Sequence, residues 1–213
     1  MSSEHTPTAD SPHIFKDGIF ADRVVVVTGG GSGIGAALTE GFLAQGANVA
    51  FVQRSDASAF VDTMEARYNN RPLFMPCDIV DIPALHACMD QAAEAHGPIT
   101  VLVNNAAHDL RHETQGFTVE DWDAMQAINL RPHFFSTQRA VIGMEAAGGG
   151  SIINFSSISY MMGNAGYHAY VAAKAGKSVA VIDKAVFPRN KLCGGGFTGR
   201  ATRYFKEAYG TDG

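Results

Sequence analysis

The chain has 213 residues, of which 46% are hydrophobic and 17% are charged. This balance suits one globular domain with a core of its own. The formal net charge of −5 argues against nucleic acid and anionic membranes as partners, because both attract basic surfaces.

Polar residues dominate the N-terminus, and we expect residues 1–15 to form a flexible tail ahead of a domain spanning residues 16–177. The first twenty residues contain no apolar run, so they predict neither a signal peptide nor a membrane span. Cys77, Cys88 and Cys193 are scattered and form no C-x-x-C motif. Reduced thiols in a cytoplasmic protein are the simplest interpretation.

The first predicted strand is the apolar run at residues 24–27, which suits a strand buried on both faces of a parallel sheet. A glycine-rich turn and a helical stretch at 36–45 follow at once. Strand, glycine turn and helix in this order predict a helix N-terminus that binds a pyrophosphate, and glycine lets backbone N–H groups approach it. The candidate nucleotide contacts in this turn are Gly29, Ser32, Gly33, Ile34 and Gly35.

The second predicted strand, residues 49–52, ends without the acidic residue that would bind the ribose diol of NAD. Gln53 stands there, followed by Arg54, which could pair with the 2′-phosphate of NADP or remain a solvated loop cation. Asp56, three residues after Gln53, is a carboxylate that keeps NAD possible as the cofactor. We therefore expect NADP or NAD as the cofactor, with Arg54 favouring NADP.

A helix at 57–68 and a third strand at 73–75 lead to Asp78 and Ile79, two further candidate nucleotide contacts. Asp78 is predicted at the carboxyl edge of the sheet, where ligands bind in such folds. Its carboxylate could accept a hydrogen bond from an adenine amino group or cap the next helix. The sequence does not separate these two roles.

The next helix is predicted at 83–96, where Gly97 and Pro98 end it, and a fourth strand follows at 99–103. The strand closes on the segment Asn104–Ala107. Within that segment, Asn105 and Ala106 are candidate cofactor contacts.

The loop after this segment concentrates polar groups where a substrate would enter, and its candidate substrate contacts are Asp109, Arg111 and His112. His108 and His112 are four residues apart, like some metal-binding pairs. No carboxylate or thiol signature accompanies them, so no metal is predicted.

A long helix is predicted at residues 119–135, with Asn129 inside it and Pro132 as the site of a kink. An asparagine in this place can hold a water or a lysine if it faces a cleft. A fifth strand follows at 151–155. Five strand–helix alternations predict an α/β fold, a Rossmann-type doubly wound parallel sheet with right-handed connections.

The chain beyond the fifth strand carries Ser157, and then Tyr170 and Lys174, which lie four residues apart on one face of a predicted helix. An ammonium near a phenol favours the phenolate, so we expect the pKa of Tyr170 to fall toward the working pH. Ser157 could hydrogen-bond the same substrate oxygen. Such a trio would remove a proton from a substrate alcohol while a hydride leaves its carbon.

Four motifs, in family order and at family spacing, make residues 16–174 resemble a short-chain dehydrogenase/reductase. The spacing to Tyr170 favours Ser157 over Ser156 as the catalytic serine. One departure is Ala107, where the family usually has glycine, and alanine should fit if the backbone there is not left-handed. The motifs are Thr28–Gly35, Asn104–Ala106, Asn129, and Ser157 thirteen residues before the Tyr170-x-x-x-Lys174 pair.

The resemblance implies a role for each of these residues. Tyr170 would be the general acid/base, and Lys174 would lower its pKa and bind the nicotinamide ribose. Ser157 would fix the reacting oxygen, and Asn129 would anchor a water of the proton relay.

Within the family, the segments around residues 109–112, 128–131 and 153–159 are most similar to aldose 1-dehydrogenases. Those enzymes oxidise sugars such as xylose or arabinose to lactones. The resemblance also implies a small-molecule substrate and a homotetramer. The family's tetramer interface uses two long helices, of which the second is cut short in this sequence.

Residues 178–213 depart from the family and resemble flavin-dependent geranylgeranyl reductases. An FAD site would need a G-x-G-x-x-G motif about twenty residues before Asp183. Residues 160–166 do not contain it, so no FAD is predicted. We expect a Rossmann domain with a truncated or replaced C-terminus, in which residues 179–182 could add a sixth strand.

Two functions are therefore open from the sequence. The first is an NAD(P)-dependent oxidoreductase that acts on a hydroxyl-bearing substrate such as an aldose. The second is a truncated or chimeric dinucleotide-binding module with little or no catalytic activity.

Overall fold

The computed structural model of the chain describes residues 17–162 and 165–176. The chain divides into two units, Met1–Lys177 and Ser178–Gly213, and the described residues all belong to the first. The predicted N-terminal tail, the predicted strand at 179–182 and the flavin-like stretch fall outside the described residues and stay predictions.

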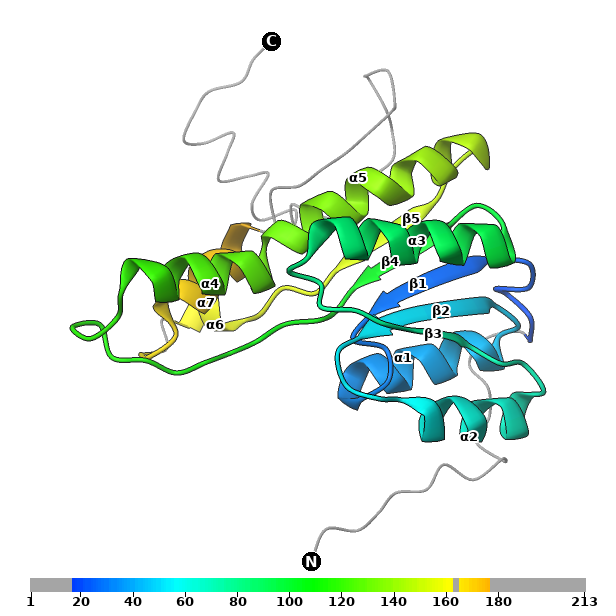
Figure 1. Cartoon of the computed structure of the whole chain (residues 1–213), viewed down its shortest axis with the longest axis horizontal. Helices are drawn as coiled ribbons and strands as arrows, with labels where there is room; N and C mark the ends of the chain where they lie inside the picture. Colours follow the sequence, from blue (N-terminus) through cyan, green and yellow to red (C-terminus); the bar gives the residue numbers. More distant parts are fainter. Residues whose placement is uncertain (1–16, 163–164, 177–213) are drawn as a thin grey trace, which may run out of the picture. The chain divides into compact units, whose positions relative to one another are not determined.

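A parallel sheet organises the described part of the chain. Its five strands are β1 (Val24–Thr28), β2 (Asn48–Gln53), β3 (Leu73–Pro76), β4 (Val101–Asn104) and β5 (Ser151–Asn154). They lie in the order β3-β2-β1-β4-β5, and every pairing is parallel (Figure 1). In β1, Val25 pairs in register with Val49 on one side and Val101 on the other. The predicted doubly wound α/β sheet is confirmed.

Helices cover both faces of this sheet because its central strand is apolar on both faces. The helices are α1 (Gly33–Ala44), α2 (Ser58–Tyr68), α3 (Ile82–His96), α4 (Val119–Asn129), α5 (Arg131–Ala146), α6 (Ser159–Met162) and α7 (His168–Gly176). Val24 and Val26 belong to one buried cluster, to which α3 and α5 contribute. Val25 and Val27 point the other way, into a cluster with α1 and α2 (Figure 1). β1 is buried at all five residues.

The single helix predicted at 119–135 is wrong, because the structure has two helices there. α4 ends at Asn129, and α5 begins at Arg131 after Leu130, whose φ of −128° and ψ of −55° depart from helical values. Pro132 falls in the first turn of α5, where its missing N–H costs nothing. The proline therefore starts a new helix, which runs on to Ala146, rather than kinking an old one.

Local capping signals place the ends of the other helices. Asp81 accepts a hydrogen bond from the Ala84 N–H at 3.0 Å and caps α3, and Gly97 ends that helix with a φ of 94°. Thr118 and Asp121 form a reciprocal capping box at the start of α4. Among the described residues, no helix has the length and apolarity needed to cross a membrane.

Candidate active site

The glycine-rich turn between β1 and α1 is folded so tightly that side chains cannot enter it. A Cβ on Gly35 would overlap the carbonyl group of Gly29, and one on Gly30 would overlap Phe51. The Gly29 N–H donates to the Val52 carbonyl at 2.7 Å with a φ of 70°, a backbone conformation that glycine adopts at little cost. This geometry requires the glycines that the sequence singled out.

The N-terminus of α1 opens toward solvent beyond this turn. A Cβ on Gly33 would meet nothing within 4 Å, and Ile34 is 64% exposed. Ser32, the N-cap residue, makes no capping hydrogen bond with its side chain to any described residue. The first N–H groups of α1 can therefore receive an anion. Together with the glycine turn they form a cradle that fits the diphosphate of a dinucleotide.

Gln53 occupies the end of β2, where a ribose would lie. Its Oε1 accepts a hydrogen bond from the Gly31 N–H at 2.9 Å, and its Nε2 donates to the Ser55 carbonyl at 2.9 Å. Arg54 beside it is exposed, and its Nη1 lies 3.9 Å from the Asp78 Oδ2. The side chain that could meet a 2′-phosphate thus stands at the rim of the cradle.

Asp78 lies at the carboxyl end of β3, as predicted, but it does not cap α3. Its Oδ1 accepts a hydrogen bond from the Val80 N–H at 3.1 Å, and Asp81 is the capping residue. The capping role considered for Asp78 is therefore wrong, and the adenine role stays a prediction. Ile79 is buried, with 4% of its surface exposed, so its side chain belongs to the core.

Asn105 fastens the end of β4 to the glycine turn. Its Nδ2 donates to the Thr28 carbonyl at 3.0 Å, and the N–H groups of Asn105 and Ala106 both donate to the Thr28 hydroxyl at 3.0 Å. Asp22 and Asn69 are the non-glycine residues with positive φ in the described ranges, so Ala107 is not left-handed. The condition under which alanine should fit at this position is therefore met.

Asn129 is fully buried at the end of α4, where it holds the loop that follows β4. Its Oδ1 accepts from the His108 N–H at 2.9 Å, and its Nδ2 donates to the carbonyls of His108 at 2.8 Å and Met125 at 3.1 Å. The sequence suggested a water or a lysine as the partner of this amide. In the structure, the bonds of this amide fix the loop carrying the predicted substrate contacts, and the water or lysine role stays a prediction.

The three predicted catalytic residues come from the segment after the end of β5 and from helix α7. They are Ser157, Tyr170 and Lys174. Lys174 is 2% exposed, its Nζ donates to the Phe155 carbonyl at 3.0 Å, and it lies 5.3 Å from the centre of the Tyr170 ring. Ser156, the serine that the family spacing disfavours, donates to the Lys174 carbonyl at 2.8 Å. Ser156 therefore holds α7 in place, and Ser157 is the serine beside Tyr170.

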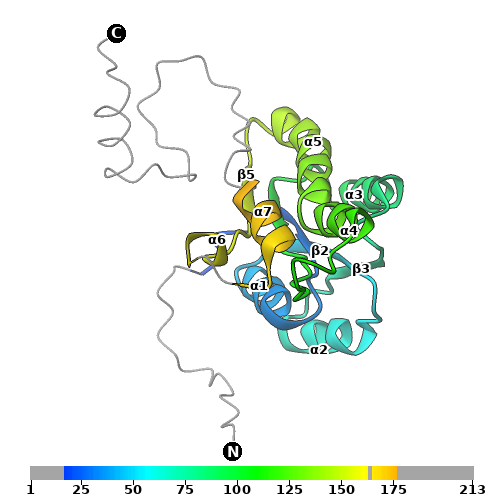
Figure 2. The ribbon, with the colours of Figure 1, turned by 90° about the vertical axis from the view of Figure 1, so that its left-hand side faces the viewer.

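Helix α4 and the loop at His112 hold α7, which carries Tyr170 and Lys174, from the other side. α7 packs beside α4, and the Gln126 Nε2 donates to the Ala169 carbonyl at 3.0 Å (Figures 1 and 2). The Ala169 N–H donates to the His112 Nε2 at 3.4 Å. The sequence did not single out Gln126, because nothing local marks a residue whose partner lies 43 positions away.

The pKa of Tyr170 is raised, whereas the sequence predicted that it would fall. Burial of the phenol is the largest cause, and the negative charge of Asp109 adds to it. The Ser157 hydroxyl hydrogen-bonds Tyr170 and lowers the pKa. The sequence reveals the Lys174 charge but not the burial of the phenol, and the predicted direction was therefore wrong.

Polar and aromatic side chains lie near Tyr170. The Arg111 Nε donates to the Tyr167 hydroxyl, and its guanidinium lies 5.0 Å from the centre of the Tyr167 ring. The Tyr167 and Tyr170 rings are 6.2 Å apart. His112 stacks on Phe117, with ring centres 3.7 Å apart. Tyr167 was missed from the sequence, although its three-residue distance from Tyr170 is compatible with a shared face.

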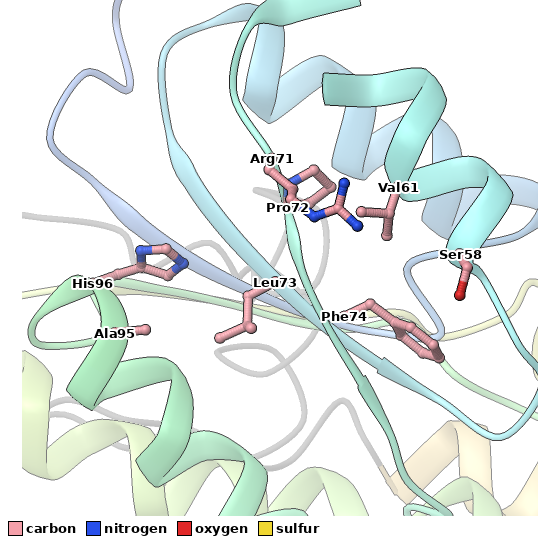
Figure 3. A pocket seen from close by; sticks show the side chains of 8 residues that line it. All are labelled: Ser58, Val61, Arg71, Pro72, Leu73, Phe74, Ala95 and His96. Carbon is pink, nitrogen blue, oxygen red and sulfur yellow. The ribbon is translucent and has the colours of Figure 1, made fainter. Parts of the chain in front are cut away.

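A separate shallow hollow of about 280 Å³ lies at the outer edge of β3, the strand farthest from β5 (Figure 3). Arg71 at this hollow is already ion-paired with Asp62 and Glu65. None of the predicted site residues lines it. The lining residues are Ser58, Val61, Arg71, Pro72, Leu73, Phe74, Ala95 and His96.

The described residues hold no group of three or more His, Cys, Asp or Glu side chains placed to bind a metal ion. His108 and His112 have different surroundings: the backbone of His108 is bound by Asn129, and the ring of His112 lies between Phe117 and α7.

Residues 23–181 match the family described as short chain dehydrogenase. The chain is 45% identical over 157 residues to a probable galactose dehydrogenase of Rhizobium meliloti, covering 73% of this chain and 61% of that protein. It is 41% identical over 155 residues to a D-xylose 1-dehydrogenase of Caulobacter vibrioides, covering 71% and 60%. The chain thus spans about three fifths of the length of these relatives.

A solved structure supports the same fold. It is a crystal structure of a protein assigned as a short-chain alcohol dehydrogenase from Sinorhizobium meliloti 1021, with a TM-score of 0.70 and 29% identity. The match covers 74% of this chain and 63% of that one.

Proposed function

The chain belongs to the short-chain dehydrogenase family, and we propose that it moves hydride between a nicotinamide dinucleotide and the C1 hydroxyl of an aldose. One observation carries the proposal: a buried lysine and a serine flank a tyrosine at the same sheet edge as an open, glycine-lined helix N-terminus. A chain of contacts joins the two halves, from Gly29 through Asn105 to the paired ends of β4 and β5.

NADP or NAD would bind across this edge and, when bound, would supply the hydride acceptor. Backbone groups of Gly29, Ser32, Gly33, Ile34 and Gly35 would face the diphosphate. Asp78 and the backbone of Ile79 would lie at the adenine, and Asn105, Ala106, Tyr170 and Lys174 at the nicotinamide half. The exposed Arg54 favours NADP, since no carboxylate ends β2 to bind a ribose diol.

Tyr170 would accept the proton of the substrate hydroxyl, with Ser157 hydrogen-bonded to the same oxygen. Lys174 would bind the ribose and would place a positive charge beside the phenol ring. Asn129 would keep the loop of Asp109, Arg111 and His112 over the substrate. Because only the phenolate can accept the proton and the pKa of Tyr170 is raised, oxidation should become faster as the pH rises above neutrality.

An aldose is proposed as the substrate on two grounds. Relatives at 41–45% identity are named as xylose and galactose dehydrogenases. The surroundings of Tyr170 also include hydrogen-bonding groups of Asp109, Arg111 and Tyr167, which suit a polyhydroxylated ring.

The test is a purified chain assayed with NADP and with NAD against galactose, xylose and arabinose, with lactone identified as the product. Nucleotide affinity is measured in parallel by fluorescence titration. Reduction of the nucleotide that Tyr170→Phe abolishes would support the proposal. Nucleotide binding without turnover on any sugar would instead support a dinucleotide-binding module.

Two properties of the whole protein are proposed along with this function. A homotetramer would be tested by light scattering of the purified protein, and a monomer would contradict it. A cytoplasmic location would be tested by cell fractionation, since it rests on the scattered cysteines alone.

A further inference from the structure

A second serine stands directly behind Ser157. Ser159 is the first residue of α6, and only 8% of its surface is exposed. Its Oγ lies 2.6 Å from the Ser157 Oγ, and its N–H donates to that same Ser157 oxygen at 3.2 Å. One residue therefore contacts the Ser157 hydroxyl twice.

The donor and acceptor capacity of a hydroxyl gives this double contact a consequence. A serine hydroxyl has one proton to donate and two lone pairs to accept with. The Ser159 N–H occupies one lone pair of Ser157, and the Ser159 O–H, when it is the donor, occupies the other. The Ser157 proton is then the one hydrogen-bonding element of that hydroxyl left for an outside partner.

We propose that Ser159 is a positioning residue, which fills both acceptor sites of the Ser157 hydroxyl so that its proton points at Tyr170 and at the substrate oxygen. This inference rests on the proposed function for its catalytic meaning. Without Ser159, the Ser157 hydroxyl could rotate and donate its proton elsewhere. Ser157 would remain present but would meet the reacting oxygen in only some of its rotamers.

The direct test follows the ionisation of Tyr170 and needs no substrate. Protein labelled with ¹³C at the tyrosine Cζ atoms is titrated by NMR, and the Tyr170 signal is identified by its loss in Tyr170→Phe. The Ser157 hydrogen bond lowers the pKa of Tyr170, so Ser157→Ala should move the midpoint to higher pH. Ser159→Ala should move it in the same direction, because it disorients the same donor.

Two matched variants separate orientation from general disturbance. Ser159→Thr keeps the hydroxyl and the N–H, and should titrate like the unchanged protein. Ser151→Ala removes an exposed serine at the far end of β5 and should also leave the midpoint in place. If Ser159→Ala does not fold, Ser159→Cys, which keeps the volume but weakens the donor, takes its place.

A Tyr170 midpoint that moves in Ser157→Ala but stays in Ser159→Ala would overturn the inference. So would a midpoint that moves in neither, or equally in Ser159→Thr and Ser159→Ala. With an aldose that turns over, Ser159→Ala should lower kcat by roughly tenfold with little change in KM, the size expected for one misdirected hydrogen bond. Absence of sugar turnover would refute the proposed function alone, since the titration would still decide the role of Ser159.

Discussion

The nucleotide half and the catalytic half of the site are held together by different means. Around the glycine turn, the decisive feature is close packing: Phe51 leaves no room for anything larger than hydrogen on Gly30. The Gly29 backbone and the side chains of Gln53 and Asn105 bond the turn to its neighbours. Around Tyr170, the contacts run through side chains: Asn129 to the His108 backbone and Gln126 to the α7 backbone.

The difference indicates which changes each half should tolerate. The nucleotide half should tolerate no Cβ at its closest approaches, while side-chain changes away from Gln53 and Asn105 should matter less. The catalytic half should fail when single amides or hydroxyls are deleted, since each deletion removes hydrogen bonds that hold a loop or helix in place. Substitutions in one half should therefore leave the function of the other largely intact.

The largest effect is expected from Tyr170→Phe, which keeps the ring and removes the proton acceptor. Turnover should fall by roughly a hundred- to ten-thousand-fold, the usual contribution of general acid/base catalysis. Nucleotide affinity, measured by fluorescence titration, should change little. Robust turnover by the variant would show that another group handles the proton.

The nucleotide half should break at Gly35→Ala, whose added methyl group would overlap the Gly29 carbonyl. We expect a loss of about 1–3 kcal/mol in the free energy of unfolding and a strong loss of nucleotide affinity. Gly41→Ala is the matched control in the same helix, because a Cβ there meets nothing within 4 Å. It should stabilise α1 by about 0.5–1 kcal/mol. Equal behaviour of the two variants in thermal unfolding would contradict the steric argument.

The same difference explains why the sequence predicted the nucleotide half better than the catalytic half. The glycine turn, the five strands and the ends of α3 are local patterns, and the sequence identified them. The break between α4 and α5 was expected only as a kink, because a proline in a helical run can do either. The partners of Asn129 and Gln126 and the proximity of Tyr167 to Arg111 depend on segments far apart in the chain, which no local pattern records.

Asn129→Ala should test whether the catalytic half depends on a single amide. The substitution removes the three hydrogen bonds of the amide, two of which tie the loop at His108 to α4, at a cost of about 1–3 kcal/mol. Turnover should fall while nucleotide affinity holds. The control is Asn70→Ala. It removes one hydrogen bond from a side-chain amide to the Ala47 carbonyl, far from Tyr170, and should spare turnover. Loss of nucleotide affinity in Asn129→Ala would show that the halves are not independent.

Arg54→Ala should separate the two nucleotides. If the guanidinium meets a 2′-phosphate, NADP affinity should drop by roughly tenfold, a modest loss because the side chain is mostly exposed. NAD affinity should stay the same, and Arg54→Lys should lose less than Arg54→Ala. Equal weakening of both nucleotides, or tighter NAD binding by the unchanged protein, would remove the case for this contact.

The smallest effect should come from Asp109→Asn, which tests electrostatics rather than contact. The negative charge of Asp109 raises the pKa of Tyr170, because it disfavours a second negative charge on the phenol. Removing the charge should lower that pKa, so the phenolate forms at lower pH and the rise of sugar oxidation with pH begins earlier. The shift should shrink at high salt, which screens exposed charges, and Asp109→Glu should restore the original profile. A profile that moves to higher pH in Asp109→Asn would show that the carboxylate acts on the substrate instead of on Tyr170.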